Sequence, residues 1–208
     1  MGDVIFQLPL GAVLLGWMLA GGSPGPATLA VIGTSMQYGR RAGLTLAAGV
    51  MLGSATWGIA AGLGLSAMML AHVWIFEVIR YLGVAYLMLL AIKSLRAACR
   101  GGEAAVPLAS GRKLFSNGAL LHLTNPKAVL SWGAFYAIDL APGAGWTAIW
   151  ALFAMLLGAS TIIFFGYALL FSSARIAAAY ARAKRGFEAA FGLLFGLASL
   201  KILTARLI

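Results

Sequence analysis

The sequence predicts an all-α membrane protein of six transmembrane helices, arranged as two inverted three-helix repeats. First, 62% of its 208 residues are hydrophobic and 10% are charged, whereas a soluble domain carries about 25% charged residues. Second, six apolar stretches approach or exceed the roughly 20 residues that cross a bilayer. Third, the first and fourth stretches are both broken by proline motifs. We therefore expect helices 1 and 4 to be discontinuous.

The six spans form one integral membrane domain over residues 1–208, with half-repeats at about 1–100 and 112–208. The first runs from about 6 to 38 and contains "SPGP". The second covers about 42–70 and the third about 73–95. After the polar connection "RGGEAAVPLASGRK", the fourth covers about 114–140 and contains "NPK". The fifth covers about 146–171 and the sixth about 187–207. Because the N-terminal stretch has no basic start, we expect a retained span rather than a cleaved signal peptide.

The net charge of +10 is distributed unevenly between the two sides of the predicted membrane protein. Eleven basic residues follow spans one, three and five, and three lie on the other side. Since lysine and arginine are enriched in cytoplasmic loops, the three basic loops are expected inside and both termini outside. The charge is thus assigned to a membrane surface rather than to nucleic acid. The inside group is Arg40, Arg41, Lys93, Arg96, Arg100, Arg112, Lys113, Arg175, Arg182, Lys184 and Arg185.

Two other residue types limit or support this topology. Trp74 and Trp146 fall at the predicted outer ends of spans three and five, where amphipathic rings favour the interface. Cys99 is the single cysteine, so an intramolecular disulfide and a cysteine-rich metal site are both excluded.

The first break interrupts a helix where helix should continue. Proline lacks an N–H and clashes with the carbonyl four residues back. Pro24 and Pro26 are therefore expected to free the carbonyls of Ala20 and Gly22. Ser23 is typical of an N-cap followed by proline at the first helical position. A new half-helix is expected to begin there.

The second break follows the same pattern. Asn125 is a good N-cap, and Pro126 suits the next position and frees the carbonyl of His122. A shift of 102 residues places Ser23 and Pro24 on Asn125 and Pro126. Each half has three spans. Because three is an odd number of crossings, the second half begins on the opposite side of the membrane, so the two halves have opposite orientations. Paired breaks in an inverted repeat indicate a transporter's binding site, although two structural kinks supported by neighbouring helices are the alternative.

The breaks suit a zwitterion. Half-helix N-termini attract anions, and freed carbonyls attract cations, so an amino acid would match both. Lys127 lies in the middle of a span, where a cation costs about 2.5–3.5 kcal/mol of insertion free energy. It also lies at a half-helix N-terminus, the positive end of the helix dipole, which disfavours a cation. A substrate carboxylate, water or a protein partner is expected to compensate it; the alternative is that its stem snorkels. The predicted substrate-binding residues are Ala20, Gly22, Ser23, Pro24, Gly25, Pro26, His122, Asn125, Pro126 and Lys127.

The remaining polar and small residues have weaker patterns. His122 would either relay protons or bond between helices. Asp139, beside "APGAG", is expected to be a solvated loop acid at the outer interface, and is kept with Ser54 as a possible pathway residue. Ser54 also opens a stripe of small residues on span two, and span six has two glycines at the same spacing, patterns typical of close helix packing. These residues are Ser54, Gly58, Gly62 and Ser66, then Gly192 and Gly196.

The chain resembles the lysine exporter and homoserine/threonine-resistance (LysE/RhtB) translocators over nearly its whole length. The matching segments are "SPGPATLAVI", "GRRAGLTLAAGVMLG", "IRYLGVAYLMLLAIKSLRA" and "LLHLTNPKAVLSWGAF". The resemblance implies a multi-pass exporter of amino acids or derivatives in a bacterial inner membrane, driven by the proton motive force. The family's PGP motif lands on 24–26 and its NPK motif on 125–127. Many members have an acid where this chain has Ser54, which argues against a lysine-type substrate.

Two other function classes compete with this interpretation. One is export of a metal or other inorganic ion on a similar scaffold, although one cysteine, two histidines and few intramembrane acids offer few ligands. The other is an intramembrane hydrolase using Ser23 or Ser35 with His122, for which the sequence offers no Gly-x-Ser-x-Gly motif. We expect a small-molecule substrate and membrane lipids as partners, no cofactor and no enzyme activity. A homo-oligomer is left open.

Overall fold

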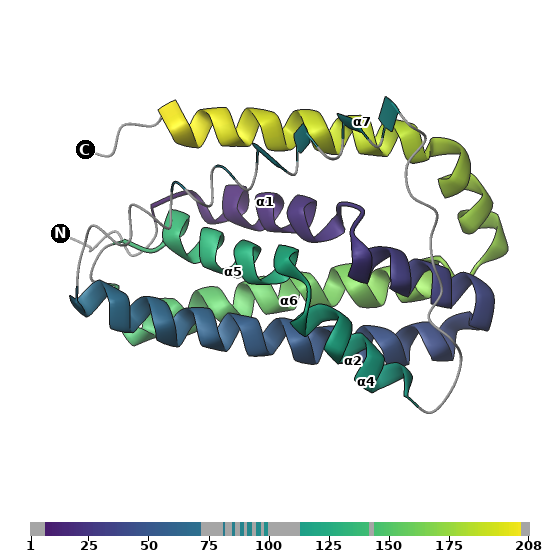
Figure 1. Cartoon of the computed structure of the whole chain (residues 1–208), viewed down its shortest axis with the longest axis horizontal. Coiled ribbons are helices and arrows are strands. Elements are labelled where there is room, and N and C mark those ends of the chain that lie inside the picture. The colour runs from purple at the N-terminus through teal and green to yellow at the C-terminus, as the bar shows by residue number, and fades with distance from the viewer. Residues whose placement is uncertain are drawn as a thin grey trace.

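The computed structural model describes residues 7–71, scattered residues between 81 and 99, 113–141 and 144–204. Every regular element in these ranges is an α-helix (Figure 1). The predicted first, second, fourth and fifth spans all appear close to their expected bounds. The predicted third span lies largely outside the described residues, as do Trp74 and most of the polar connection after it. The helices are α1 (Leu10–Gly22), α2 (Pro26–Ala71), α4 (Leu114–Leu123), α5 (Pro126–Asp139), α6 (Trp146–Leu170) and α7 (Ala174–Thr204).

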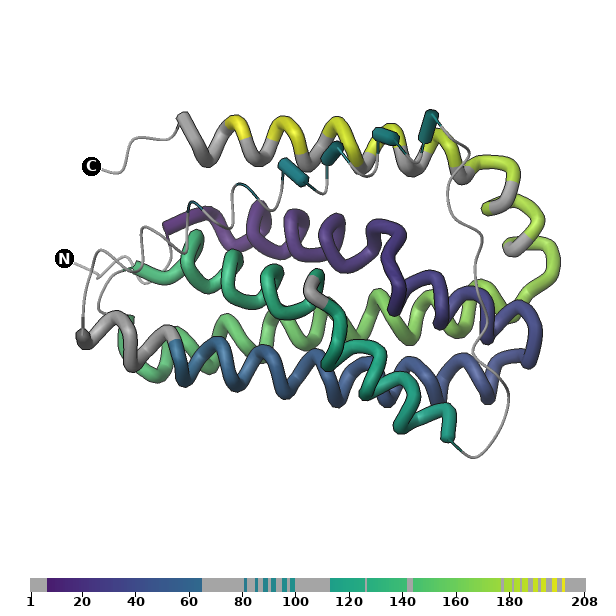
Figure 2. The backbone as a smooth tube through the Cα atoms, in the orientation of Figure 1, coloured from purple at the N-terminus to yellow at the C-terminus, as the bar shows by residue number. Residues whose placement is uncertain are grey.

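Helix α2 contains the end of one span and all of the next, because the chain reverses at Gly39. This glycine adopts φ 82° and ψ −178°, a conformation that L side chains disfavour. Figure 2 shows the tube folding back at this point, so that the two parts of α2 run in opposite directions. The predicted boundary between spans one and two is therefore confirmed at a single hinge residue.

The broken spans need both of their halves to cross a bilayer. Helix α1 has 13 residues, which at 1.5 Å per residue is about 20 Å, short of the roughly 30 Å hydrocarbon core. Helices α4 and α5 have 10 and 14 residues and are equally short. By contrast, 146–170 is long and apolar enough to cross without interruption. The stretch 26–64 also meets this test by length and composition, but it contains the reversal at Gly39 and so holds parts of two spans.

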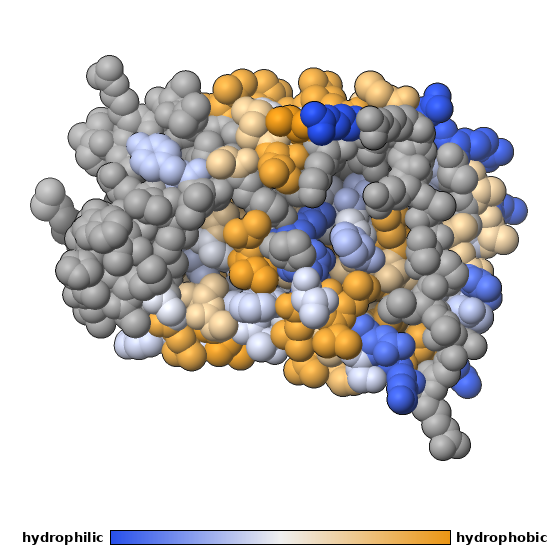
Figure 3. Space-filling model, viewed as in Figure 1, coloured by the Kyte–Doolittle hydropathy of each residue, from blue (hydrophilic) through white to orange (hydrophobic). Residues whose placement is uncertain are grey.

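The bundle has two distinct ends. The Gly39 hinge, the start of α4 and the short joint between α6 and α7 lie at one end, on the right of Figure 1. Exposed basic residues gather there, and Figure 3 shows hydrophilic side chains at this edge of the molecule. We call this the basic end; it includes Arg40, Arg41, Lys113 and Arg175. These four basic residues, which follow spans one, three and five, thus share one side.

The opposite end joins the beginning of α1 to the end of α5. The Gln7 N–H donates to the Asp139 carbonyl at 2.7 Å, and the Leu8 N–H donates to Asp139 Oδ1 at 3.1 Å. The last turns of α7 reach the same end in Figure 1. We call this the terminal end. Trp146, which begins α6, is 54% exposed, consistent with its predicted place at a helix end.

The last helix begins earlier than the sequence pattern predicts. Only residues 171–173 separate α6 from α7, and α7 begins at Ala174 rather than near 187. Arg175, Arg182 and Arg185 therefore lie on an exposed helix instead of in a loop. The physical reason is composition: alanine, arginine and lysine are strong helix formers, so the segment "ARIAAAYARAK" continues the helix without being apolar.

Small residues allow the helices to approach closely. A Cβ on Gly49 would collide with the Phe115 carbonyl, and one on Gly53 would lie 2.9 Å from the His122 Cβ. These contacts press α4 against α2. The predicted packing stripe is confirmed at Gly58, where a Cβ would lie 2.8 Å from Phe153 Cε2. The side chain of Ser66 lies outside the described residues.

The two span-six glycines that the sequence assigned to packing also face a neighbour. A Cβ on Gly192 would clash with the Leu95 side chain, and one on Gly196 would lie 3.9 Å from the Ala91 Cβ. The packing interpretation is therefore confirmed at Gly192, where only a hydrogen fits.

Candidate substrate site

The two proline breaks face each other inside the bundle. The Lys127 Nζ donates to the Ser23 carbonyl at 2.8 Å and lies 2.6 Å from the Ser23 Oγ. A Cβ on Gly25 would lie 3.3 Å from the Lys127 Cδ, so the lysine stem runs along the first break. The expectation that Lys127 requires compensation is met, in this structure, by protein oxygens at the C-terminal end of α1. That end carries the negative pole of the helix dipole.

At the first break, the prediction that Ser23 caps the new half-helix is wrong. Ser23 ends α1 instead: its N–H donates to the Leu19 carbonyl and its Oγ to the Ala20 carbonyl, both at 2.9 Å. Helix α2 begins at Pro26. The serine hydroxyl bonds to a carbonyl in the last turn of α1, and Gly25 occupies the position directly before α2. The pair that matches Asn125 and the proline after it is therefore Gly25 and Pro26.

At the second break, the predicted cap is confirmed. Helix α4 ends at Leu123, and the Asn125 Oδ1 accepts the Lys127 N–H at 3.0 Å. Pro126 occupies the start of α5. Asn125 is buried, and its side chain satisfies one of the backbone donors left open at the start of α5.

The carbonyls expected to be free have donors in this structure. The Ala20 carbonyl accepts the Ser23 hydroxyl. The Gly22 carbonyl accepts the Tyr167 hydroxyl of α6 at 2.8 Å. The His122 carbonyl accepts the amide three residues further along at 3.2 Å. The prediction of three unoccupied carbonyls is therefore wrong, because proline removes a helical donor and the fold supplies another.

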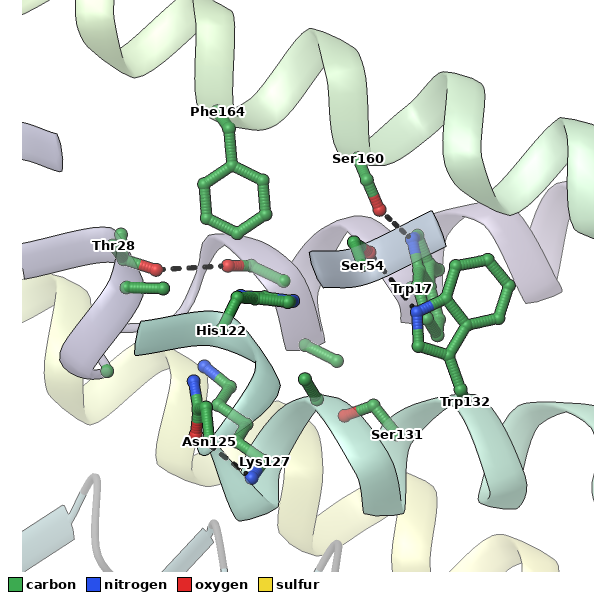
Figure 4. Close-up of a pocket in the computed structure, with 15 residues that line it drawn as sticks. Trp17, Thr28, Ser54, His122, Asn125, Lys127, Ser131, Trp132, Ser160 and Phe164 are labelled. Atoms are coloured by element: carbon green, nitrogen blue, oxygen red, sulfur yellow. Dashed lines mark hydrogen bonds between the residues drawn. The ribbon is translucent and has the colours of Figure 1, made fainter. Parts of the chain in front are cut away.

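A cavity of about 40 Å³ lies beside the breaks, lined by side chains from α1, α2, α4, α5 and α6 (Figure 4). An engineered cavity that binds benzene measures about 150 Å³, so an amino acid requires the cavity to widen. Six predicted residues line it, whereas Gly22, Ser23, Pro24, Pro26 and Asp139 are not among its lining residues; the side chain of Pro126 lies outside the described part of the chain. The six are Ala20, Gly25, Ser54, His122, Asn125 and Lys127.

His122 presents its ring to this cavity. It is 6% exposed, and its Nδ1 is buried without a hydrogen-bond partner. The ring packs edge-to-face against Phe164, with centroids 5.6 Å apart, and Figure 4 shows it between Phe164 and the side chains of Asn125 and Lys127. Buried polar atoms are rarely left unsatisfied. The Nδ1 is therefore a candidate hydrogen-bonding group for a molecule in the cavity.

The sequence patterns missed the aromatic side of the cavity. Trp17 Nε1 donates to Ser160 Oγ at 2.9 Å, and Trp132 Nε1 donates to Ser54 Oγ at 3.2 Å. From the sequence, tryptophans were interpreted only where they fall at the predicted membrane interfaces. The available signal was position, since each of these tryptophans lies six residues from a break.

Asp139 is neither in a solvated loop nor at the cavity. It is 1% exposed and joins the terminal end through the amides of Gln7 and Leu8. The segment before α1 covers it, which the sequence around "APGAG" does not reveal. Asp139 follows Lys127 by twelve residues in one helix, about 18 Å at 1.5 Å per residue. The prediction that Asp139 is a solvated loop acid is therefore wrong.

Metal ligands do not gather in the described part of the chain: nowhere in it do three or more His, Cys, Asp or Glu side chains form a candidate site. Cys99 is exposed.

Comparison with known proteins decides the family. The family model described as LysE type translocator matches residues 20–206. The chain belongs to the LysE type translocator family. This translocator is therefore an integral membrane transporter and not an enzyme, which sets aside the intramembrane hydrolase.

Relatives match this translocator along most of both chains. It is 32% identical to an uncharacterized membrane protein of Pseudomonas aeruginosa, over 88% of this chain and 89% of that protein. It is 26% identical to the threonine efflux protein of Escherichia coli, over 88% of this chain and 92% of the other. The threonine efflux protein of Salmonella typhimurium matches equally well. No solved structure matches the chain.

Proposed function

We propose that this translocator is a secondary-active exporter of small, uncharged-side-chain amino acids or their derivatives, driven by the proton motive force across a bacterial inner membrane. The observation that carries the proposal is the ammonium of Lys127 bonded across the two breaks, beside a cavity. Both termini lie outside in this proposal, and the basic end faces the cytoplasm.

The charge of the cavity favours a zwitterion without a cationic side chain. Among the described residues that line it, Lys127 alone carries a formal charge; the polar remainder is serine, threonine, asparagine and histidine. A substrate carboxylate would neutralise Lys127, whereas a lysine side chain would bring a second cation beside it. Relatives named threonine efflux protein support a substrate of threonine's size.

The position of Lys127 suggests how binding leads to movement. Its ammonium occupies the negative end of α1, at the Ser23 carbonyl. A substrate ammonium would compete for that place, while the substrate carboxylate would attract Lys127, His122 and the first N–H groups of α2. Binding would therefore exchange the bond between the breaks for bonds to the substrate. Once the bridge is released, the two halves can move against each other, as inverted-repeat transporters do.

Inside-out membrane vesicles provide the direct test. Export then becomes uptake, and labelled threonine should accumulate when the vesicle lumen is acidified. An uncoupler should abolish accumulation, vesicles without the translocator should show none, and labelled lysine should be taken up far more slowly. Rapid lysine uptake would contradict the charge argument. Threonine accumulation that resists the uncoupler would contradict proton coupling.

A further inference from the structure

We propose that Trp17 and Trp132 are specificity-determining residues: together they form the wall against which the substrate side chain packs, and they set its size limit. Ser160 and Ser54 act as positioning residues that hold the two indoles. This inference rests on the proposed function, because it assigns a place to one part of the exported amino acid.

The two indoles form one continuous surface beside the cavity. Their ring centroids are 4.6 Å apart with planes inclined at 62°, and both tryptophans line the cavity. They are nearly fully buried, at 5% and 1% exposed. Phe135 packs edge-on against Trp17 at 5.0 Å, and Phe153 contacts Trp132 at 5.7 Å. Neither phenylalanine is among the residues that line the cavity, so these contacts limit how far the indoles can move to admit a larger guest.

The orientation of each indole is fixed by a hydroxyl from another helix. Trp17 of α1 donates to Ser160 of α6, and Trp132 of α5 donates to Ser54 of α2. An indole N–H is a donor only, so each ring has one polar anchor, and that anchor is satisfied. In Figure 4 the two bonds lie side by side at one end of the cavity. Four helices therefore define the position of this surface.

The wall lies on the side of the cavity away from the charged groups. Lys127, Asn125 and Thr28 belong to the breaks or their first turns. Trp17 precedes Ser23 by six residues and Trp132 follows Pro126 by six, about 9 Å along each helix. Both displacements point toward the terminal end, since α1 begins and α5 ends there. An amino acid with its charged groups at the breaks would thus direct its side chain at the indoles.

The test measures selectivity rather than activity alone. Uptake of labelled leucine and labelled threonine into inside-out vesicles gives a leucine-to-threonine ratio for each variant. Trp17→Leu and Trp132→Leu keep an apolar side chain but create space, and each should raise this ratio about tenfold, since one extra methylene in a pocket is worth 10-fold or more. Ser54→Ala and Ser160→Ala should raise it about threefold by releasing the rings.

Matched controls and a double substitution separate positioning from general damage. Thr56 and Thr161 lie on the same helices as the two serines, are exposed, and bond to carbonyls of their own helix. Thr56→Ala and Thr161→Ala should leave the ratio unchanged. In a Trp132→Phe background, which lacks the N–H, Ser54→Ala should cause no further change, because the hydroxyl acts only through that N–H.

The outcomes distinguish this inference from the function on which it rests. If wild-type vesicles move neither amino acid, the proposed function fails and the wall fails with it. If the wild type moves threonine but the tryptophan variants have the wild-type leucine-to-threonine ratio, only the proposed wall is overturned. Should a leucine variant not reach the membrane, the serine variants decide: an unchanged ratio in both Ser54→Ala and Ser160→Ala overturns the positioning role.

Discussion

The two breaks begin their second half-helices with proline but are stabilised in different ways. The second is capped from within its own sequence, because Asn125 caps α5 from within the joint, and Trp57 of α2 donates to the Leu123 carbonyl beside it. The first has local bonds from Ser23 to Ala20 and from Thr28 to Gly21. It also has two partners on other helices: Tyr167 of α6 donates to Gly22, and Lys127 of α5 donates to Ser23. Among these donors from other helices only Lys127 carries a charge, so a substrate ammonium could take its place at the Ser23 carbonyl. Under the proposed function, we therefore expect substrate binding to rearrange the first break.

The largest effect is expected from Lys127→Met, which keeps much of the stem but removes the ammonium that joins the breaks. A hydrogen bond to a charged group is worth about 1.5–3 kcal/mol, so threonine uptake into inside-out vesicles should fall by roughly 10- to 100-fold. The protein should still be inserted in the membrane, which detergent extraction and size-exclusion chromatography check. Wild-type uptake at equal expression would remove Lys127 from the proposed mechanism.

A moderate effect is expected from Tyr167→Phe, which removes only the hydroxyl that supports the Gly22 carbonyl. Losing one neutral hydrogen bond costs about 1 kcal/mol, and the first break should lose part of its order. Threonine uptake should fall about fivefold. Tyr38→Phe is the matched control, because Tyr38 is an exposed tyrosine near the hinge. If both variants behave alike, the first break does not depend on α6.

A smaller and different effect is expected at the second break. Asn125→Ala removes an N-cap, a change that costs about 1 kcal/mol of stability. The midpoint of thermal unfolding in detergent should decrease, while Asn125→Ser should restore most of it, since serine also caps. Ser23→Ala should not show this pattern, because Ser23 does not cap α2. If Asn125→Ser does not restore the unfolding midpoint, Asn125 acts through something other than the cap.

What the sequence predicts well is local. Proline removes a donor wherever it stands, and asparagine before proline caps the same chain, so both breaks and the Asn125 cap were predictable. The role of Ser23 was not, because a serine between two helix ends can bond backward or forward, and the outcome depends on α1's last turn. The partner of Lys127 lies 104 residues away, beyond any local pattern. The same holds for the serines that receive the two indole N–H groups.

The last and smallest effect concerns the terminal end, which serves as the distant reference for both breaks. Asp139 joins α5 to the segment before α1 by accepting the Leu8 N–H. Asp139→Asn keeps an oxygen that can accept the Leu8 N–H. Because Asp139 lies about 18 Å from Lys127 along the helix, this substitution should change threonine uptake by less than twofold. Asp139→Ala leaves a backbone donor without its acceptor, which costs about 1–3 kcal/mol, so thermal stability should fall while the apparent KM for threonine stays constant. Loss of uptake in Asp139→Asn with unchanged thermal stability would instead place this carboxylate in proton coupling. The exchangeable bonds of transport would then extend beyond the first break to the terminal end.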